Sequence, residues 1–534
     1  MEGNMLFTSY DFIFFVMLVF LLYFTICKRF QWQLLLVASY IFYAFSGIGN
    51  LLYLLATTIS TYLISYQMSK ILMRQKAYLA NEGKSLSRDE KKQYKQLNKK
   101  KTWHLLLLSI IINIGMLSVV KYTDFTIHNI NGIFNAFGSG VHLSFLNIML
   151  PLGISFYIFK NVGYSIDVYR GKYNAESNIF KLALFTSFFP QLIQGPISRF
   201  DDISTSLFDR HDYNARAMSR GLQRILWGFF KKLVIADRML IGMQALLDDP
   251  QMYQGVYVFI AMLFYALQLY ADFTGGIDIT IGISECLGIK VAENFIRPYF
   301  SKNIKEYWNR WHITMGTWFT DYIFYPISVC KPMLNLSKFS RKTLGEQLGK
   351  RVPVWLACIV VWFATGIWHG SSWNFIVWGL VNCVIILISQ ECEPLYKKFH
   401  ASFKVEGSLG FKIFRIVRTV LLLSMIRMFD CYRDVPLTFK MLGTMVTTWN
   451  LDALWNGTLM QIGLSAIDYI ILAVGVIILF TVSMIQRSGS VRDKIYRYHY
   501  SLRFIIWFGL FVITILMGIY GIGYNESQFI YNQF

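Results

Sequence analysis

The sequence contains few charged residues for its length. Asp, Glu, Lys and Arg make up only 15% of its 534 residues, whereas 55% of them are hydrophobic. A soluble domain does not need that much apolar surface, but repeated apolar runs of membrane-spanning length do. The composition therefore excludes an ordinary soluble protein and predicts a polytopic membrane protein.

The motifs of common soluble enzymes and of metal sites are also missing. There is no Walker loop, GxSxG elbow, HExxH pair or dinucleotide fingerprint, and the seven cysteines form no CxxC pair. Because the cysteines mostly lie in or beside apolar runs, we interpret them as small core residues. No two of the eight histidines lie four residues apart on one predicted helix, so a bound metal is not expected.

The formal net charge is +20, but most basic residues are spread over the loops between apolar runs. This pattern indicates membrane topology under the positive-inside rule rather than nucleic-acid binding. Attraction to anionic membrane lipids, and to a phosphate-bearing donor, follows as a secondary effect. The apolar runs fit about twelve spans of ~20 residues. No linker, low-complexity tract or repeat divides residues 1–534, so we expect one membrane domain.

Residues 179–197 do not fit a simple span. They are apolar, yet basic residues flank both ends, which predicts that both ends are cytoplasmic. Pro190, Gly195 and Pro196 also interrupt a regular helix. A re-entrant segment accounts for both features, because irregular backbone at membrane depth is tolerated where protein buries it. The alternative is a kinked span and a different topology.

Residues 303–324 predict an amphipathic helix that lies in the cytoplasmic interface. Helical spacing divides its side chains into an aromatic face (Trp308, Trp311, Met315, Trp318, Phe319, Tyr322) and a polar face (Glu306, Asn309, Arg310, Thr317, Asp321). His312 falls at the edge of the aromatic face, where histidine is more often a packing residue than a catalyst.

Two acids, Asp272 and Asp278, lie within the apolar run 256–283. Acidic side chains are costly inside a membrane, so they are rare and face the protein interior. Two interpretations remain open for this pair. The acids form an interior polar site, or they are structural partners of nearby basic groups.

The stretch GIWHGSSW at residues 366–373 lies between apolar runs at 354–365 and 374–389. His369 is therefore at, or just beyond, the end of a membrane-crossing helix. Ionisable groups at such depth are usually functional or firmly paired.

Burial beside Trp368 and Trp373 favours a neutral imidazole at His369, the form that accepts a proton from a hydroxyl during acyl transfer. Gly366, Gly370, Ser371 and Ser372 would leave room for a substrate to approach closely. The alternative, which the residues alone support equally, is a structural histidine that caps a buried turn.

Six blocks follow one another along the chain: PLGISFY at 151–157, FFPQLIQGPI at 188–197, YALQLYADFTG at 265–275, ENF at 293–295, YWNRWHI at 307–313 and GIWHG at 366–370. Together they resemble the membrane-bound O-acyltransferase family, in particular its alginate O-acetyltransferase branch. The resemblance covers roughly residues 100–390 and is weaker in the flanking segments 1–99 and 391–534. The sequence departs from it at Thr274-Gly275-Gly276, where relatives often have Ser-Gly-Tyr.

This resemblance implies an all-α polytopic fold with about 12 transmembrane helices, plus re-entrant and interfacial helices around a central tunnel. It implies that His369 matches the essential histidine and that His312 matches the second characteristic one. The donor would arrive from the cytoplasm and the acceptor from the outer face. The residues that it favours for substrate binding are Gln191, Asp272, Trp308, Asn309, Arg310, Trp311 and Trp368.

We therefore expect a multi-pass O-acetyltransferase of a bacterial plasma membrane. Its donor would be acetyl-CoA, with no bound cofactor, and its acceptor a cell-surface or secreted polysaccharide. A separate extracytoplasmic acetyltransferase or esterase-like partner would complete the transfer. The alternative within the family is D-alanyl transfer to teichoic acid from a carrier protein. The alternative of another class is a transporter whose path is lined by Lys160, Asp167, Asp272 and Asp278.

Overall fold

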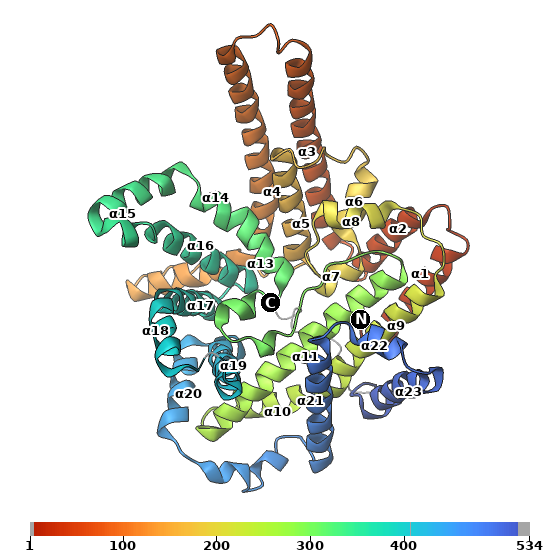
Figure 1. Cartoon of the computed structure of the whole chain (residues 1–534), viewed down its shortest axis with the longest axis vertical. Coiled ribbons are helices and arrows are strands. Elements are labelled where there is room, and N and C mark those ends of the chain that lie inside the picture. Colours follow the sequence, from red (N-terminus) through yellow and green to blue (C-terminus); the bar gives the residue numbers. More distant parts are fainter. Residues whose placement is uncertain (1–4, 406, 522–534) are drawn as a thin grey trace. The chain divides into compact units, whose positions relative to one another are not determined.

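The computed structural model describes residues 5–405 and 407–521, and they are almost entirely helical (Figure 1). Within these residues, β-structure is limited to one isolated bridge, between Phe295 and Trp311. The predicted all-α class is therefore confirmed. The described residues form two compact units: the first runs to Ser219 and includes Ile283–Ala292, and the second comprises the remaining residues.

The first unit contains eight helices among its described residues: α1 (Tyr10–Phe24), α2 (Gln31–Ala44), α3 (Asn50–Asn81), α4 (Arg88–Ala136), α5 (Ile154–Tyr169), α6 (Ile179–Ser187), α7 (Pro190–Gln194) and α8 (Phe200–Phe208). Helices α3 and α4 form a long antiparallel hairpin (Figure 1). A capping box between Ser87 and Glu90 starts α4. The basic stretch 70–101 is helical on both arms of this hairpin and is interrupted by the turn at residues 82–87.

The apolar segment 179–197 is broken where its prolines predict. Helix α6 ends at Ser187, Pro190 occupies the first turn of α7, and Gly195 ends α7 in an extended conformation. Proline is tolerated in a first turn because its missing N–H has no helical acceptor there. The segment is buried in its unit, and its re-entrant course through the membrane stays a prediction.

The second unit holds most of α9 (Ala215–Phe229) and α11 (Val256–Cys286). Its other α-helices are α10 (Asp237–Asp248), α12 (Ile304–Trp308), α13 (Ile313–Phe319), α14 (Tyr325–Ser328), α15 (Lys331–Gly349), α16 (Val352–His369), α17 (Trp373–Glu391), α18 (Glu393–Phe403), α19 (Leu409–Tyr432), α20 (Val435–Thr447), α21 (Ala466–Gln486), α22 (Val491–Tyr496) and α23 (Tyr500–Met517). Two π-helices, η1 (Phe230–Ala236) and η3 (Thr320–Phe324), and three 3₁₀ turns, η2 (Pro298–Phe300), η4 (Leu451–Leu454) and η5 (Thr458–Met460), complete it.

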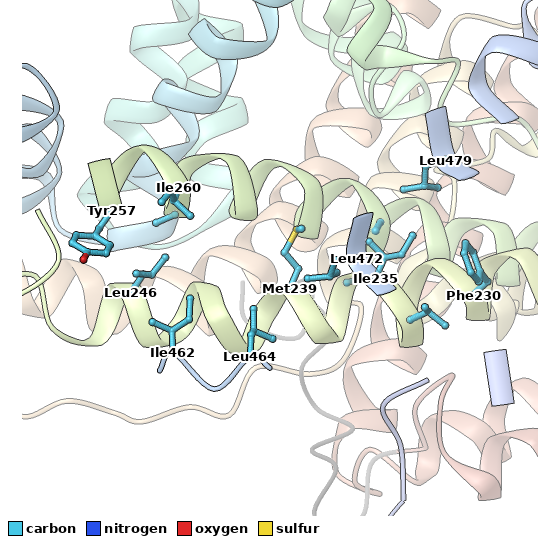
Figure 2. Close-up of a cluster of buried hydrophobic side chains, with 14 of the residues drawn as sticks. Phe230, Ile235, Met239, Leu246, Tyr257, Ile260, Ile462, Leu464, Leu472 and Leu479 are labelled. Carbon is cyan, nitrogen blue, oxygen red and sulfur yellow. The ribbon is translucent and has the colours of Figure 1, made fainter. Parts of the chain in front are cut away.

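The core of the second unit lies where η1 and α10 pack against α11 and α21. Figure 2 shows Ile235 and Met239 beside Leu472, with Leu246 next to Tyr257 and Ile260 of α11. Close backbone approach supports this packing: a Cβ atom on Gly228 would lie 2.6 Å from the carbonyl oxygen of Gly275. Gly275 therefore has a packing role in the stretch where the sequence departs from the family pattern.

Both acids of α11 are paired with basic side chains of η1 and α9. Lys232 lies 2.7 Å from Asp272 and 2.7 Å from Asp237, and all three side chains are buried. Asp278 lies 2.6 Å from Lys231 and 2.9 Å from Arg224. The structure shows both acids in ion pairs, which offset the cost of a buried charge; a role of Asp272 in substrate binding stays a prediction.

Six described helices are long and apolar enough to cross a membrane: α4, α11, α16, α17, α21 and α23, with α1 as a shorter apolar helix. The other described helices are not both long enough and apolar enough to do so. The expected number of about twelve spans, and the tunnel among them, stay predictions.

Helices α16 and α17 form an antiparallel hairpin whose turn carries His369. At the open end of the hairpin, Glu391 of α17 pairs with Arg351 and accepts a hydrogen bond from the Trp355 indole at 3.1 Å. An 18-residue helix is about 27 Å long, so His369 lies a full membrane-crossing distance from that end. The prediction that His369 ends an apolar helix is confirmed.

Candidate active site

The residues from 303 to 324 do not form one interfacial helix. Helix α12 ends at Trp308, and α13 begins only after His312, whose φ of 48° is left-handed. The aromatic face is turned into the protein, where Trp311, Met315 and Trp318 are buried. The prediction of a continuous helix in the interface is therefore wrong, because hydrogen bonds from a distant segment hold a turn in its middle.

Asn294 supplies the hydrogen bonds that hold this turn between α12 and α13. Its side-chain oxygen accepts hydrogen bonds of 3.0 Å from both the backbone N–H and the hydroxyl of Thr314, and its carbonyl accepts one from the N–H of Ile313. The same side-chain oxygen lies 3.4 Å from Nδ1 of His312. A left-handed conformation is uncommon for histidine and persists where the surroundings impose it. Asn294 thus positions His312.

His312 is buried within an aromatic cage. Its ring centroid lies 5.0 Å from that of Phe273 and 6.0 Å from that of Trp368, both in edge-on contact. His312 lies outside the candidate membrane-spanning helices, and burial lowers its pKa well below the usual value, assisted by the positive charge of Arg427. The imidazole is therefore neutral at neutral pH.

His369 contacts the same tryptophan. Its ring centroid is 5.0 Å from that of Trp368 and 4.7 Å from that of Trp378, which belongs to α17. Trp368 therefore contacts both histidines, which are 57 positions apart in the sequence (369 − 312).

A tryptophan cluster, defined as Trp308, Trp362 and Trp378, extends this arrangement. The ring of Trp308 lies 5.0 Å from that of Trp362 and 5.8 Å from that of Trp378. The indole Nε1 atoms of Trp308 and Trp378 are buried and have no hydrogen-bond acceptor among the described residues. Buried donors are nearly always satisfied, so this cluster offers two N–H groups to a ligand.

Gly366 and Gly370 do not leave room for a substrate. A Cβ atom on Gly366 would lie 2.6 Å from the carbonyl oxygen of Phe375, and one on Gly370 would lie 2.1 Å from the Phe375 ring. The prediction of open space at these glycines is wrong, because α17 already fills it. The glycines instead allow α16 and α17 to pack closely.

Arg427 of α19 is a buried cation that the sequence interpretation missed. Its guanidinium donates a hydrogen bond of 3.1 Å to the Tyr307 hydroxyl and lies 4.5 Å above the Trp311 ring. Tyr307 and Trp311 are themselves stacked, with centroids 5.5 Å apart. An arginine within the apolar run 420–429 was the available signal, since basic groups at such positions are costly unless they are paired.

Comparisons with known proteins identify the family. A probable alginate O-acetylase AlgI of Pseudomonas putida is 32% identical over 378 residues, which are 70% of this chain and 68% of that protein. This chain belongs to the membrane-bound O-acyltransferase family. The model of that family matches residues 174–429, which include both histidines and Arg427.

Two further relatives in this family are similar to the chain over most of its length. A probable alginate O-acetylase AlgI of Pseudomonas syringae pv. tomato is 32% identical over 378 residues, 70% of this chain and 64% of that protein. A peptidoglycan O-acetyltransferase of Helicobacter pylori is 29% identical over 392 residues, 68% of this chain and 66% of that protein. The chain thus spans just under two thirds of the length of these two relatives. Family membership and the six apolar helices together show a multi-pass membrane protein.

The structure of this family member brings some predicted site residues together and not others. His312, His369, Trp308 and Trp368 are linked by the ring contacts described above, and Trp311 joins them through Phe273, whose ring centroid lies 5.9 Å from its own. The other predicted residues have different neighbours: Asn309 is exposed, Arg310 pairs with Glu306 at 2.5 Å, Asp272 pairs with Lys232, and Gln191 of the first unit accepts a hydrogen bond from Lys160 at 3.2 Å. The substrate-binding roles of these four stay predictions. Among the described residues, no group of three or more His, Cys, Asp and Glu could hold a metal ion.

Proposed function

We propose that this protein is an O-acetyltransferase that uses acetyl-CoA to acetylate a hydroxyl of a cell-surface or secreted polysaccharide. The observation that carries the proposal is the pair of histidines on Trp368, with the buried indole donor of Trp378 beside His369 and that of Trp308 next to Trp378. The names of the related alginate and peptidoglycan O-acetyltransferases support this class of reaction and acceptor.

His369 is the proposed general base. It accepts the proton of the attacking hydroxyl as the hydroxyl oxygen bonds to the thioester carbonyl carbon. The carbon–sulfur bond then breaks, the acetyl group stays on the acceptor oxygen, and the thiolate of coenzyme A takes up the proton. A half-buried position at the helix end lets His369 reach an acceptor while its aromatic neighbours limit access of water.

The indole N–H groups of Trp308 and Trp378 are the proposed donors to the thioester oxygen. Negative charge develops on this oxygen during attack, and fixed donors in a low-dielectric site stabilise it. Neither indole has to give up a protein acceptor in order to do so. In this scheme the tryptophan cluster lowers the barrier and His369 moves the proton.

His312 is a positioning residue in this proposal. Its neutral ring is held by Asn294 and contacts the edge of Trp368, so it orients the indole on which His369 packs. In the same proposal, the attacking hydroxyl belongs either to the polymer or to a separate extracytoplasmic acetyltransferase or esterase-like partner, which would then pass the acetyl group to the polymer.

The test is transfer of labelled acetyl groups by the purified protein in lipid nanodiscs. Acetyl-CoA labelled in the acetyl group is supplied with alginate fragments or with peptidoglycan fragments, and labelled glycan is counted. We expect His369→Ala to lower the rate by at least about 100-fold, whereas His104→Ala, an exposed histidine of α4, leaves it unchanged. Unchanged transfer by His369→Ala would refute the assignment.

The same preparation separates the two alternatives. If a D-alanyl carrier protein labels teichoic acid while acetyl-CoA labels nothing, the donor is a D-alanyl group and the acetyl proposal fails. If the protein supports ion-dependent solute flux that His369→Ala does not affect, and transfers no acyl group, it is a transporter. Labelled glycan formed from acetyl-CoA excludes both.

A further inference from the structure

A cavity within the second unit is lined by neither His312 nor His369. It has a volume of about 830 Å³ and is bounded by α12, α17, α18 and α19. We call it the α17–α19 groove; its lining includes Lys305, Ile386, Phe399, Phe411, Phe414 and Arg415.

The groove is strongly basic. Four of its lining residues are Lys or Arg and one is acidic, Glu393, which already pairs with Lys397 at 2.9 Å. Lys305 and Arg415 form no ion pair among the described residues, and Arg418 donates a hydrogen bond to the backbone carbonyl of Lys302. The groove therefore has uncompensated positive charge, which attracts an anionic group.

The rim of the groove is apolar and aromatic. Phe399, Phe414 and Leu395 are 46%, 56% and 66% exposed, and the rings of Phe411 and Phe414 are stacked with centroids 6.0 Å apart. Large exposed apolar side chains next to a charged patch are unusual on a water-facing surface. A ligand that complements both the basic residues and the apolar rim carries an anionic head and an apolar tail.

The position of the groove fits a membrane surface. Its lining from α17 includes Gln390, at the end of an apolar candidate span, and the following helix, α18, is short and amphipathic. The basic residues of the segment 397–418 predict that this end of α17 is cytoplasmic. Anionic lipids are enriched in the cytoplasmic leaflet, where clusters of basic residues bind them.

We propose that the α17–α19 groove binds an anionic phospholipid of the cytoplasmic leaflet. Lys305 and Arg415 contact the phosphate of the headgroup, and Phe399 and Phe414 contact the acyl chains. Because α12 carries both Lys305 and Trp308, bound lipid also steadies the helix that presents Trp308 to the tryptophan cluster. The lipid site stands whether or not the acetyl-transfer proposal holds.

The experiment measures retained lipid by native mass spectrometry of the full chain. The protein is equilibrated in nanodiscs with equal amounts of phosphatidylglycerol and phosphatidylcholine, released, and its bound lipid identified. The test variant is Lys305→Gln with Arg415→Gln. The matched control, Lys338→Gln with Lys342→Gln, removes two exposed charges of α15. Arg415→Lys, which keeps the charge, is the conservative variant.

The expected result is preferential retention of phosphatidylglycerol by the wild type, the control and Arg415→Lys. Retention by the test variant should fall by at least fivefold, since each basic residue near an anionic membrane strengthens binding by about that factor. Equal retention by the test and control variants would overturn the proposal. It would also be overturned if soluble glycerol 3-phosphate or coenzyme A displaced the lipid at equimolar concentration, because the groove would then recognise a free phosphate compound.

Discussion

His312 and His369 pack against the same indole, that of Trp368, with ring-centroid distances of 6.0 Å and 5.0 Å. One histidine is buried and held at a left-handed turn; the other is half-buried at a helix end. The two imidazoles therefore have different environments within one aromatic cluster. This difference suits one of them to orient the site and the other to exchange a proton with an acceptor.

The first prediction concerns the indole donors. Trp378→Phe keeps an aromatic ring but removes a buried N–H group that has no acceptor among the described residues. If that group stabilises the thioester oxygen, kcat for acetyl transfer should fall by about 100-fold with little change in KM. The control is Trp362→Phe, because the indole N–H of Trp362, in the same cluster, is not one of the buried donors without an acceptor. Equal losses in the two variants would indicate that the rings only pack.

The second prediction concerns the pH dependence of stability. Burial lowers the pKa of His312 in the folded protein, whereas in the unfolded chain it is about 6.5. As the pH falls below about 6.5, the unfolded state takes up a proton that the folded state does not, so stability decreases by up to about 1.4 kcal/mol per pH unit. Above that pH, His312 contributes no pH dependence.

Unfolding midpoints of the wild type and of His312→Gln, measured in detergent between pH 5 and pH 8, check this prediction. The wild type should lose more stability on acidification than the variant, and the difference between them should be constant above pH 7. A parallel decline of the two proteins would show that other groups cause the acid sensitivity.

The third prediction concerns the α16–α17 hairpin. Gly366→Ala places a Cβ atom 2.6 Å from the Phe375 carbonyl oxygen, so it should force the helices apart and lower the unfolding temperature. Gly443→Ala, in α20, meets no atom within 4 Å and should be neutral or stabilising by up to about 1 kcal/mol, because alanine favours a helix. Thermal unfolding of both variants in nanodiscs makes the comparison. Equal midpoints would contradict the packing role of Gly366.

The fourth prediction concerns Asp272. Asp272→Asn removes one of the two carboxylates around the fully buried Lys232 and should destabilise the fold by about 1–3 kcal/mol, because Asp237 still balances the lysine charge. Asp248→Asn, an exposed acid of α10, should have no effect. The unfolding midpoint and the acetyl-transfer rate per folded molecule, measured together, distinguish a structural role of Asp272 from a role in substrate binding. Unchanged stability with a lost rate would instead support the predicted substrate-binding role of Asp272.

The local features of the chain were predictable because they depend on short-range pattern. Long apolar runs predicted membrane helices, Pro190 predicted the break between α6 and α7, and the position of His369 between two apolar runs predicted a helix end. These properties follow from the cost of burying polar backbone and from the missing N–H of proline, and they do not depend on distant residues.

The sequence by itself thus determined an all-α membrane protein with a histidine at the turn of an apolar hairpin. Only the tertiary structure decided that His312 leaves the helical course of its segment, because the hydrogen bonds that impose this come from Asn294, 18 positions earlier. Tertiary structure likewise placed Arg427, from a helix more than one hundred positions later, on Tyr307. Helical periodicity describes neighbours within a segment, whereas a buried site is completed by groups that only packing brings together.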